Sequence, residues 1–211
     1  MYLPTHFAET RPEVLHELIR SQPLATLVTL DAGLPVADEI PFLLDAERNS
    51  RVTLRGHVAR ANPLCKAHPN GAPALAVFRG PQAYVSPGWY PSKAEHGKHV
   101  PTWNYVVVHA RGPLRLIEDP AALRRFLDAL TTQHEAGLPK PWKIADAPPD
   151  YIAQMMNAIV GIEIEVETLT GKWKTSQNRS ADDRLGVVQG LRERSESGAP
   201  AMADLVESTL F

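Results

Sequence analysis

The sequence predicts a mainly β fold with helical additions (α+β), in which an antiparallel sheet closes into a barrel. Five or six strand-like runs follow one another with hairpin-like links, which indicates an antiparallel sheet, and closing that sheet removes its exposed edges. Helical periodicity is confined to a few amphipathic segments. No internal repeat or clear linker divides residues 1–211, so we expect a single domain, with a helical insertion over 119–160 and a C-terminal helix and tail over 180–211.

Composition and charge narrow the classes of protein. The chain has 211 residues, of which 44% are hydrophobic and 22% charged, as in an ordinary globular protein. It has no apolar run of about 18 residues, and its N-terminus does not resemble a signal peptide, so we expect a cytoplasmic protein without a membrane span. The single Cys65 excludes an internal disulfide. A net charge of -2 gives no global attraction to nucleic acid, so any DNA-binding surface must be local.

The first strands are predicted to form a hairpin. Residues 24–30 and 34–44 are extended runs around the turn-forming residues 31–33. Pro35 and Pro41 cannot donate to a ladder, so the second arm is expected at a sheet edge.

A possible phosphate site follows the next strand, residues 51–55. Gly56, His57, Arg60 and Asn62 come where that strand ends and a short helix to about His68 begins. Free backbone N–H groups at a helix start, with an arginine close by, can hold a phosphate. The alternative is a solvated arginine and a polar residue that caps the helix.

The stretch 80–112 contains a second candidate. Two strand-like runs, 82–85 and 102–111, are joined by an irregular loop of about 16 residues, a length that is uncommon unless the loop binds something or is disordered. The stretch carries aromatic side chains suited to a planar ligand or a partner subunit, or that simply cover a barrel end: Trp89, Tyr90, Trp103 and Tyr105. The Gly-Pro pairs at 80–81 and 112–113 predict turns.

The C-terminal half is predicted to alternate helix, strand and helix. Amphipathic helices are expected over 120–133 and 151–159, and a half-buried strand over 162–166. A polar, cationic run over 171–179 precedes a helix capped by Ser180. The tail 195–211 is expected to be mobile until it meets a neighbour, with Leu205, Val206, Leu210 and Phe211 able to dock on a partner subunit.

Five segments together resemble the PaiB family of FMN-binding negative transcriptional regulators. They are MYLPTHF, LRGHVARANP, VSPGWY, VPTWNY and GKWKTSQNR, and they span residues 1–179. The resemblance implies a split β-barrel of the kind shared with pyridoxamine-phosphate oxidases and flavin reductases. It also implies a homodimer with FMN between the subunits.

The resemblance assigns cofactor-binding roles to three groups of residues. The strand-to-helix group, in which we expect Arg60 to be the principal phosphate anchor and the backbone near Leu54 to follow the flavin edge, is Leu54, Arg55, Gly56, His57, Arg60 and Asn62. A second group that could complete the pocket, in one subunit or from its partner, is Thr102, Trp103 and Asn104. A third, Lys174, Gln177 and Arg179, could contact the phosphate or ring oxygens, or alternatively cap the last helix and tie it to the barrel.

Other chemistries have little support. The sequence lacks a dinucleotide fingerprint, a Walker loop and an H-E-x-x-H zinc motif. His96, His99 and His109 could bind a metal or haem, but solvated loop histidines explain them better, and we expect no metal. No residue stands out as a general base, so any chemistry would be carried by the flavin.

Two functions remain open. One is a regulator that uses FMN as a structural cofactor or sensor and lowers transcription. The other is an FMN-dependent oxidoreductase, of flavin reductase or oxidase type, with an inherited regulatory label. The helices 120–133 and 151–159 are too far apart for a helix-turn-helix unit, so direct DNA binding has weak support.

Overall fold

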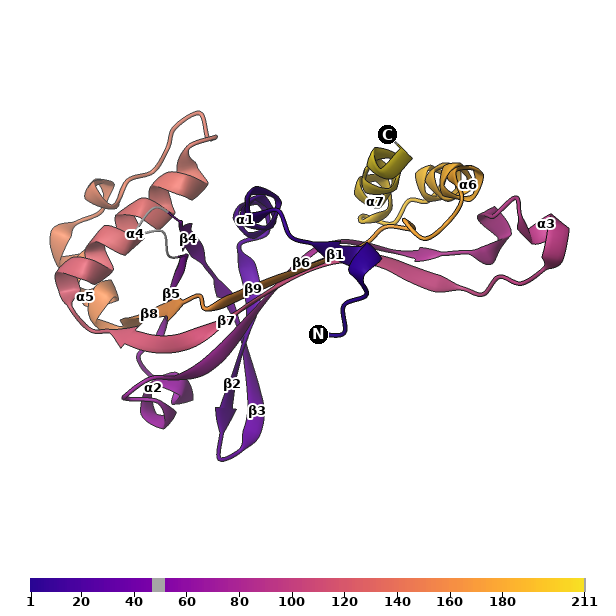
Figure 1. The fold of residues 1–211 in the computed structure, drawn as a ribbon. Helices are drawn as coiled ribbons and strands as arrows, with labels where there is room; N and C mark the ends of the chain where they lie inside the picture. The colour runs from indigo at the N-terminus through magenta and orange to yellow at the C-terminus, as the bar shows by residue number, and fades with distance from the viewer. Residues whose placement is uncertain (47–51, 211) are drawn as a thin grey trace. The chain divides into compact units, whose positions relative to one another are not determined.

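The structure, a computed structural model, describes residues 1–46 and 52–210, and its chain divides into two compact units (Figure 1). Unit 1 comprises Met1–Leu18, Phe78–Val108 and Thr170–Phe211, and unit 2 comprises Ile19–Val77 and His109–Leu169. The long strands β6 (Ala72–Val85) and β7 (Thr102–Ile117) contribute residues to both. Arg51, the first residue of one predicted strand, lies outside the described residues.

Unit 2 is built on an antiparallel sheet, as predicted. Its strand order is β3-β2-β6-β7-β8-β5-β4. The strands not yet given are β2 (Leu24–Asp31), β3 (Leu34–Pro41), β4 (Leu43–Asp45), β5 (Thr53–Ala59) and β8 (Ile159–Glu165). Closure into a barrel is not seen among the described strands, because β3 and β4 end the order without pairing to each other.

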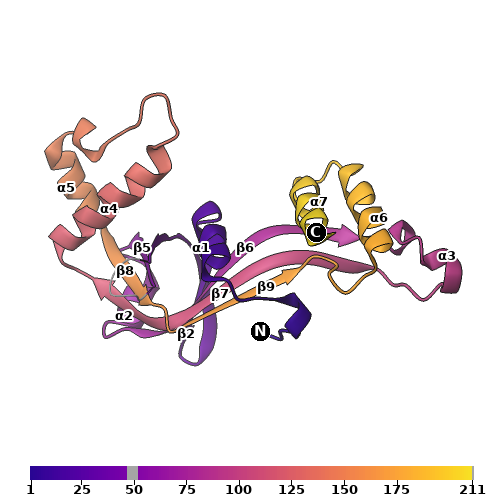
Figure 2. The same cartoon turned by 45° about the horizontal axis from the view of Figure 1, so that its top comes forward.

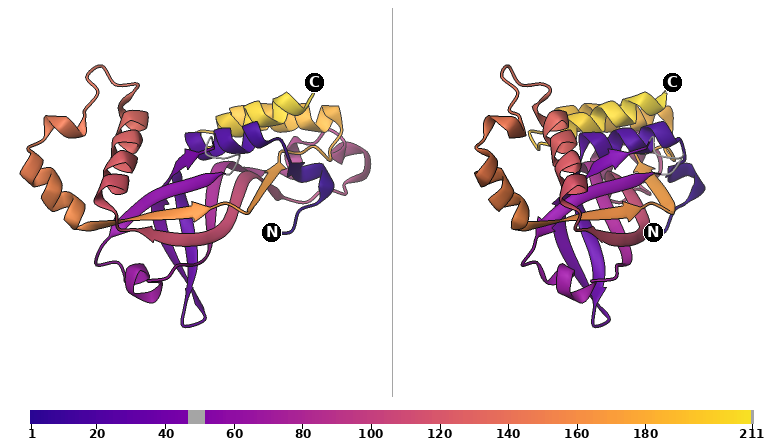
Figure 3. Two further views of the ribbon diagram at one scale, coloured as in Figure 1. Left: turned by 60° about the vertical axis from the view of Figure 1, so that its left-hand side comes forward. Right: turned by 90° about the vertical axis from the view of Figure 1, so that its left-hand side faces the viewer.

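The predicted hairpin is confirmed. β2 and β3 pair from Leu24↔Pro41 to Asp31↔Leu34, with a two-residue turn at Ala32 and Gly33. Both turn residues have positive φ, 48° and 82°, which matches the twist of a tight hairpin. β3 is an edge strand, as its prolines predict, and the hairpin projects away from α4 and α5 in both views of Figure 3.

Three helices accompany this sheet. α2 (Pro63–Ala67) follows β5, while α4 (Pro120–Glu135) and α5 (Pro149–Asn157) lie together beside β5 and β8 (Figure 1). Asp119 caps α4 by accepting hydrogen bonds from the N–H groups of Ala121 and Ala122, both 3.1 Å long. The expected helical insertion is thus a pair of helices with a connector that contains the short 3-10 turn Ile144–Asp146.

Unit 1 combines the remaining parts of β6 and β7 with two short β segments and several helices. β1 (Ala8–Glu9) pairs antiparallel with β9 (Thr168–Lys174). The sequence did not predict β9, which contains the first four residues of the cationic run, 171–174. The helical elements are the 3-10 turns Thr5–Phe7, Pro87–Trp89 and Ser208–Leu210, with α1 (Pro12–Ser21), α3 (Lys93–His96), α6 (Ala181–Arg192) and α7 (Ala199–Glu207).

The turns predicted at the two Gly-Pro pairs are wrong, because β6 and β7 run straight through them. Close packing explains both glycines. A Cβ on Gly80 would lie 2.7 Å from Leu18 Cδ1, and a Cβ on Gly112 would lie 1.8 Å from the carbonyl oxygen of Glu165. Each glycine therefore admits a neighbouring segment rather than reversing the chain.

The expectation of a mobile tail is also wrong for the described residues, which form α7. Figure 2 shows α6 and α7 side by side. Met202, Ala203 and Val206 are fully buried, and Arg192 pairs with Glu207 at 2.7 Å. Val206 is therefore used inside this chain, while Phe211 lies outside the described residues. In the described part of the chain, no helix has both the length and the apolar character that a membrane crossing requires.

Candidate functional site

The predicted residues of β5 alternate between two environments. Leu54 is fully buried, and its backbone lies between Leu44 of β4 and Ile164 of β8 in the sheet. A Cβ on Gly56 would lie 2.8 Å from the side chain of Ile40, so this glycine allows the core to close. Side chains alternate along a strand, and Arg55 and His57 consequently face the helices α4 and α5 instead.

Arg55 is neutralised by two carboxylates. Its Nε donates to Glu163 Oε2 at 2.9 Å, and its Nη1 donates to Asp45 Oδ2 at 2.8 Å. Burial alone would lower the pKa of Arg55, but these hydrogen bonds outweigh it and raise the pKa. The three side chains share an open pocket of about 460 Å³ with α4. Arg55 is thus part of a charge-balanced network.

Arg60, the expected phosphate anchor, donates to the backbone. Its Nε lies 2.8 Å from the carbonyl oxygen of Asn157, and its Nη2 lies 3.1 Å from that of Ile159. The guanidinium therefore holds the junction of α5 and β8. The side-chain Oδ1 of Asn62 accepts from the N–H of Leu64 at 2.9 Å, so its helix-capping role is confirmed. The phosphate role of Arg60 stays a prediction.

In unit 1, three predicted residues from distant parts of the sequence come together. Lys174, at the end of β9, donates from Nζ to the hydroxyl of Thr102 and, at 2.6 Å, to the carbonyl oxygen of Trp103. Trp103 itself is 54% exposed. The structure thus joins the VPTWNY and GKWKTSQNR segments, which the resemblance grouped only by function.

Two more cations surround Lys174. Burial lowers the pKa of Lys174, and the positive charges of Lys172 and Arg179 lower it further. Lys172 is 7% exposed and lies 5.2 Å from the centre of the Tyr105 ring, while Arg179 lies 4.9 Å from the centre of the Tyr90 ring. No carboxylate of the described chain pairs with any of the three cations. We call Tyr90, Thr102, Asn104, Lys172, Lys174, Ser176 and Arg179 the cationic cluster.

Buried polar groups mark the same region. Asn104 and Ser176 are almost fully buried, and Asn104 Nδ2 donates to Ser176 Oγ at 2.9 Å. Ser176 has φ 65°, a left-handed conformation that is costly for serine and is held here by its surroundings. Burial raises the pKa of the Tyr90 hydroxyl, a residue only 3% exposed, and the charge and hydrogen bond of Arg179 partly oppose that rise. Buried polar side chains and the Arg179 charge are thus gathered in one place.

Gln177 fits the structural alternative better. Its Oε1 accepts from the N–H of Thr175 at 2.8 Å, and its Nε2 donates to the carbonyl oxygen of Trp173 at 2.6 Å. These bonds fold the loop between β9 and α6 onto itself. Gln177 thereby fixes the loop that carries Ser176 and Arg179.

The long aromatic loop is docked on α6. Trp89 lies against Gly186 and Gly190, and a Cβ on Gly190 would come within 2.3 Å of the indole. Ser92 donates from Oγ to Asp183, with oxygen–oxygen distances of 2.7 and 2.8 Å. Burial raises the pKa of Asp183, but the hydrogen bonds from Ser92 and Ser180 outweigh burial and lower it. The loop is therefore anchored, and it holds Tyr90 against Arg179.

Ser92, His99 and Asp183 do not form a nucleophilic triad. In such a triad the carboxylate orients the histidine, which takes the serine proton. Here Ser92 Oγ donates to Asp183 and lies 2.8 Å from His99 Nε2, so the histidine serves as a donor to Ser92. His96 and His99 stack at 4.9 Å in unit 1, and His109 belongs to unit 2. Within the described residues, no cluster of His, Cys, Asp or Glu could hold a metal ion.

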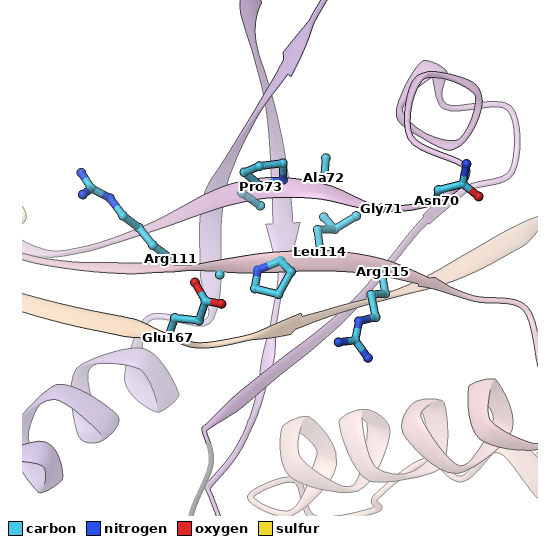
Figure 4. Close-up of a pocket in the computed structure, with 11 residues that line it drawn as sticks. Asn70, Gly71, Ala72, Pro73, Arg111, Leu114, Arg115 and Glu167 are labelled. Atoms are coloured by element: carbon cyan, nitrogen blue, oxygen red, sulfur yellow. The ribbon is translucent and has the colours of Figure 1, made fainter.

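One further open pocket lies in unit 2, where β6 approaches β7 (Figure 4). It measures about 540 Å³, and Arg111, Arg115 and Glu167 stand around it. Gly71, with φ 89°, lies so close to β7 that a Cβ would come within 2.4 Å of the Leu114 carbonyl oxygen. Arg115 also pairs with Glu165 at 3.6 Å. The charges are mixed, so this pocket offers a weaker anion site than the cationic cluster.

Comparison with known proteins agrees with this class of fold. The solved structure of an FAD- and haem-binding protein from Mycobacterium smegmatis matches with a TM-score of 0.57 and 24% identity, over 79% of this chain and 73% of that one. Together with the antiparallel sheet and added helices, the match shows a fold of the split-barrel type.

Sequence comparison identifies the family. The family model described as "Putative FMN-binding domain" matches residues 1–168. Protease synthase and sporulation protein PAI 2 of Bacillus subtilis is 30% identical, over 100% of this chain and 98% of that protein. An uncharacterized protein of Emericella nidulans is 34% identical, over 98% of this chain and 96% of that protein. The chain belongs to the PaiB family of FMN-binding domain proteins.

Proposed function

We propose that this protein binds FMN and holds the phosphate of the cofactor at the cationic cluster, chiefly through Lys174 and Arg179. The observation that carries the proposal is the set of three adjacent cations without a carboxylate partner in the described chain. A phosphate dianion supplies the missing negative charge. By contrast, Arg55 is already paired with two carboxylates. Arg60, like Lys174, donates to oxygen atoms of the protein, but Lys174 has two further cations close to it.

Other residues of the cluster supply hydrogen bonds and an apolar surface. The hydroxyl of Tyr90 lies beside Arg179 and can donate to a bound oxygen atom, and Thr102 offers a hydroxyl next to Lys174. Trp103 presents an exposed ring beside them. When bound, FMN would supply redox chemistry. The residues of this chain would bind the phosphate, orient the cofactor and exclude water.

We further propose that the protein is a negative transcriptional regulator with FMN as structural cofactor or sensor. What supports this role is membership of the PaiB family, with a likeness over the full chain to Protease synthase and sporulation protein PAI 2 of Bacillus subtilis. The alternative is an FMN-dependent oxidoreductase.

Two assays on the FMN-loaded protein separate these functions. Salt-sensitive, sequence-selective shifts of promoter DNA support the regulator. FMN-dependent turnover of NADH or NADPH, without any shift of DNA, would contradict the regulator and support the oxidoreductase.

We also propose a homodimer. Trp103 is 54% exposed and Val100 is 69% exposed, and both are close in sequence to Thr102 of the cationic cluster. They present apolar surface that a second subunit can cover. Light scattering at micromolar concentration should show twice the chain mass of 23.2 kDa. A stable monomer at that concentration would contradict the proposal.

A further inference from the structure

A third pocket described in unit 2 differs in its chemistry from the cationic cluster. It measures about 330 Å³, a size typical of small-molecule sites. The helices α4 and α5, the connector between them and the strands β5 and β8 all contribute. The lining residues are His57, Leu127, Thr131, Trp142, Ile144, Ile152, Met155, Met156, Ala158 and Ile159.

The polar residues of the lining include His57 and Thr131. The Nδ1 atom of His57 is buried and shut off from the pocket, so Nε2 is the ring nitrogen that a bound molecule can reach, and the ring centre lies 6.0 Å from that of Phe126. Burial lowers the pKa of His57, so the imidazole is neutral at pH 7. A neutral ring nitrogen that is unpaired can exchange one hydrogen bond with an uncharged group.

The rim is apolar and is held in place. Trp142 and Met155 are 43% and 40% exposed, although both are large apolar side chains. The backbone N–H of Trp142 donates to Glu135 Oε2 at 2.8 Å, and the backbone N–H of Lys143 donates to Asp146 Oδ2 at 2.9 Å. The connector therefore positions Trp142 at the pocket instead of leaving it free. Methionine and tryptophan together form an adaptable surface for flat apolar molecules.

From these observations we propose that the pocket binds a small, uncharged, flat apolar molecule through one hydroxyl group hydrogen-bonded to His57. The lining contains no Arg or Lys, which excludes the phosphate of FMN as its occupant. The site is therefore separate from the proposed cofactor site, and the two can be tested independently.

The test is calorimetric titration of the FMN-loaded full chain with 1-naphthol, naphthalene and 1-naphthalenesulfonate. We expect saturable binding of 1-naphthol at one site per chain, weaker binding of naphthalene and none of the charged sulfonate. His57→Phe keeps a ring of similar size but removes the nitrogen. It should weaken 1-naphthol about three- to ten-fold and leave naphthalene unchanged.

A pair of variants, one directly after α5 and one within it, tests the location. Ala158, which follows the last residue of α5, lines the pocket, so Ala158→Phe should fill it and weaken both neutral probes by at least about ten-fold. Ala153→Phe is the matched control, because it adds the same ring to an exposed position of α5 outside the pocket. It should bind both probes like the parent.

Several results would overturn the proposal. These are no saturable binding of either neutral probe, unchanged binding in Ala158→Phe, or displacement of FMN by 1-naphthol, which would place the probe in the cofactor site. A change of oligomeric mass in Ala158→Phe, without a change in probe affinity, would instead identify the rim as a protein interface. Unfolding midpoints of all variants, measured in urea, show whether a lost signal reflects a lost fold.

Discussion

The β5–α2 region of unit 2 and the cationic cluster of unit 1 both carry predicted cofactor residues, but their positive charges differ in availability. Arg55 lies between two carboxylates, and Arg60 donates to two carbonyl oxygens. Lys172, Lys174 and Arg179 have no carboxylate partner in the described chain, and burial together with their mutual repulsion lowers the pKa of Lys174. A cation that carboxylates already neutralise, such as Arg55, is a weaker anion site than a group of adjacent cations without carboxylate partners.

The largest effect is expected where the aromatic loop meets α6. Gly190→Ala would place a Cβ 2.3 Å from the Trp89 ring, so the loop must move, at a cost of about 3 kcal/mol in unfolding free energy. Because the loop holds Tyr90 against Arg179, FMN affinity should fall as well. Urea unfolding measures the first effect and flavin fluorescence the second.

Gly137→Ala is the matched control for this substitution. A Cβ added at Gly137 would meet no atom within 4 Å, so the change should stay within about 0.5 kcal/mol. Equal stability of Gly190→Ala and Gly137→Ala would show that the loop is not docked as described.

The next largest change in unfolding free energy is expected for Arg55→Met, which tests whether Arg55 has a structural role. Arg55→Met leaves Asp45 and Glu163 without their shared cation and should lower the unfolding free energy by about 2 kcal/mol. Arg115→Met removes an exposed arginine 3.6 Å from Glu165 and should cost less than about 0.5 kcal/mol. Neither should change the preference for FMN over riboflavin. If Arg55→Met abolishes that preference, Arg55 belongs to the phosphate site.

A smaller effect concerns the contact between Ser92 and Asp183. Ser92→Ala removes the donor to a buried carboxylate and should cost about 1.5 kcal/mol at neutral pH. Since the folded state lowers the pKa of Asp183, this stabilisation is complete above the ordinary aspartate value of about 3.9 and disappears as pH falls through the lowered pKa. The stability gap between parent and variant should therefore narrow as the pH falls below about 4. A gap that shows no narrowing with falling pH would assign the effect to packing.

Charge also predicts how FMN affinity depends on alkaline pH. The pKa of Lys174 is lowered, so its charge is lost before pH reaches the ordinary lysine value of about 10.4. FMN affinity should fall through that lowered pKa in the parent, whereas Lys174→Met should lack this fall. Riboflavin is the control, because it has the same ring without the phosphate. A fall in affinity that it shares with FMN would come from ionisation of the flavin ring.

Local sequence signals predicted much of the fold. The hairpin at Ala32 and Gly33, the edge strand with its two prolines, and the caps of Asn62 and Ser180 all depend on residues close in sequence. The Gly-Pro pairs misled the prediction because the reason for Gly80 and Gly112 is a close approach of distant segments. β9 was missed because a strand rich in lysine lacks the apolar alternation that identifies a strand.

The sequence indicated which residues belong to the candidate site, but not which of their charges other side chains neutralise. The sequence shows that the run 171–179 is cationic. It does not show that Lys174 contacts Thr102, which lies 72 positions away in the sequence. Arg55 donates a hydrogen bond to Glu163, which is 108 positions away in the sequence. Arg60 donates one to the backbone of Asn157, which is 97 positions away. Such partners are set by strand pairing across the sheet, which sequence patterns do not specify.

The most direct test compares the affinities of FMN and riboflavin in the parent, Lys174→Met and Arg60→Met. Only FMN carries the phosphate, so the ratio of the two affinities isolates the phosphate contact from damage to the fold. We predict that Lys174→Met reduces this ratio by about ten- to a hundred-fold, because a charge-assisted hydrogen bond is lost, and that Arg60→Met leaves it unchanged. A reduced ratio in Arg60→Met together with a parental ratio in Lys174→Met would contradict the account and place the phosphate at the end of β5.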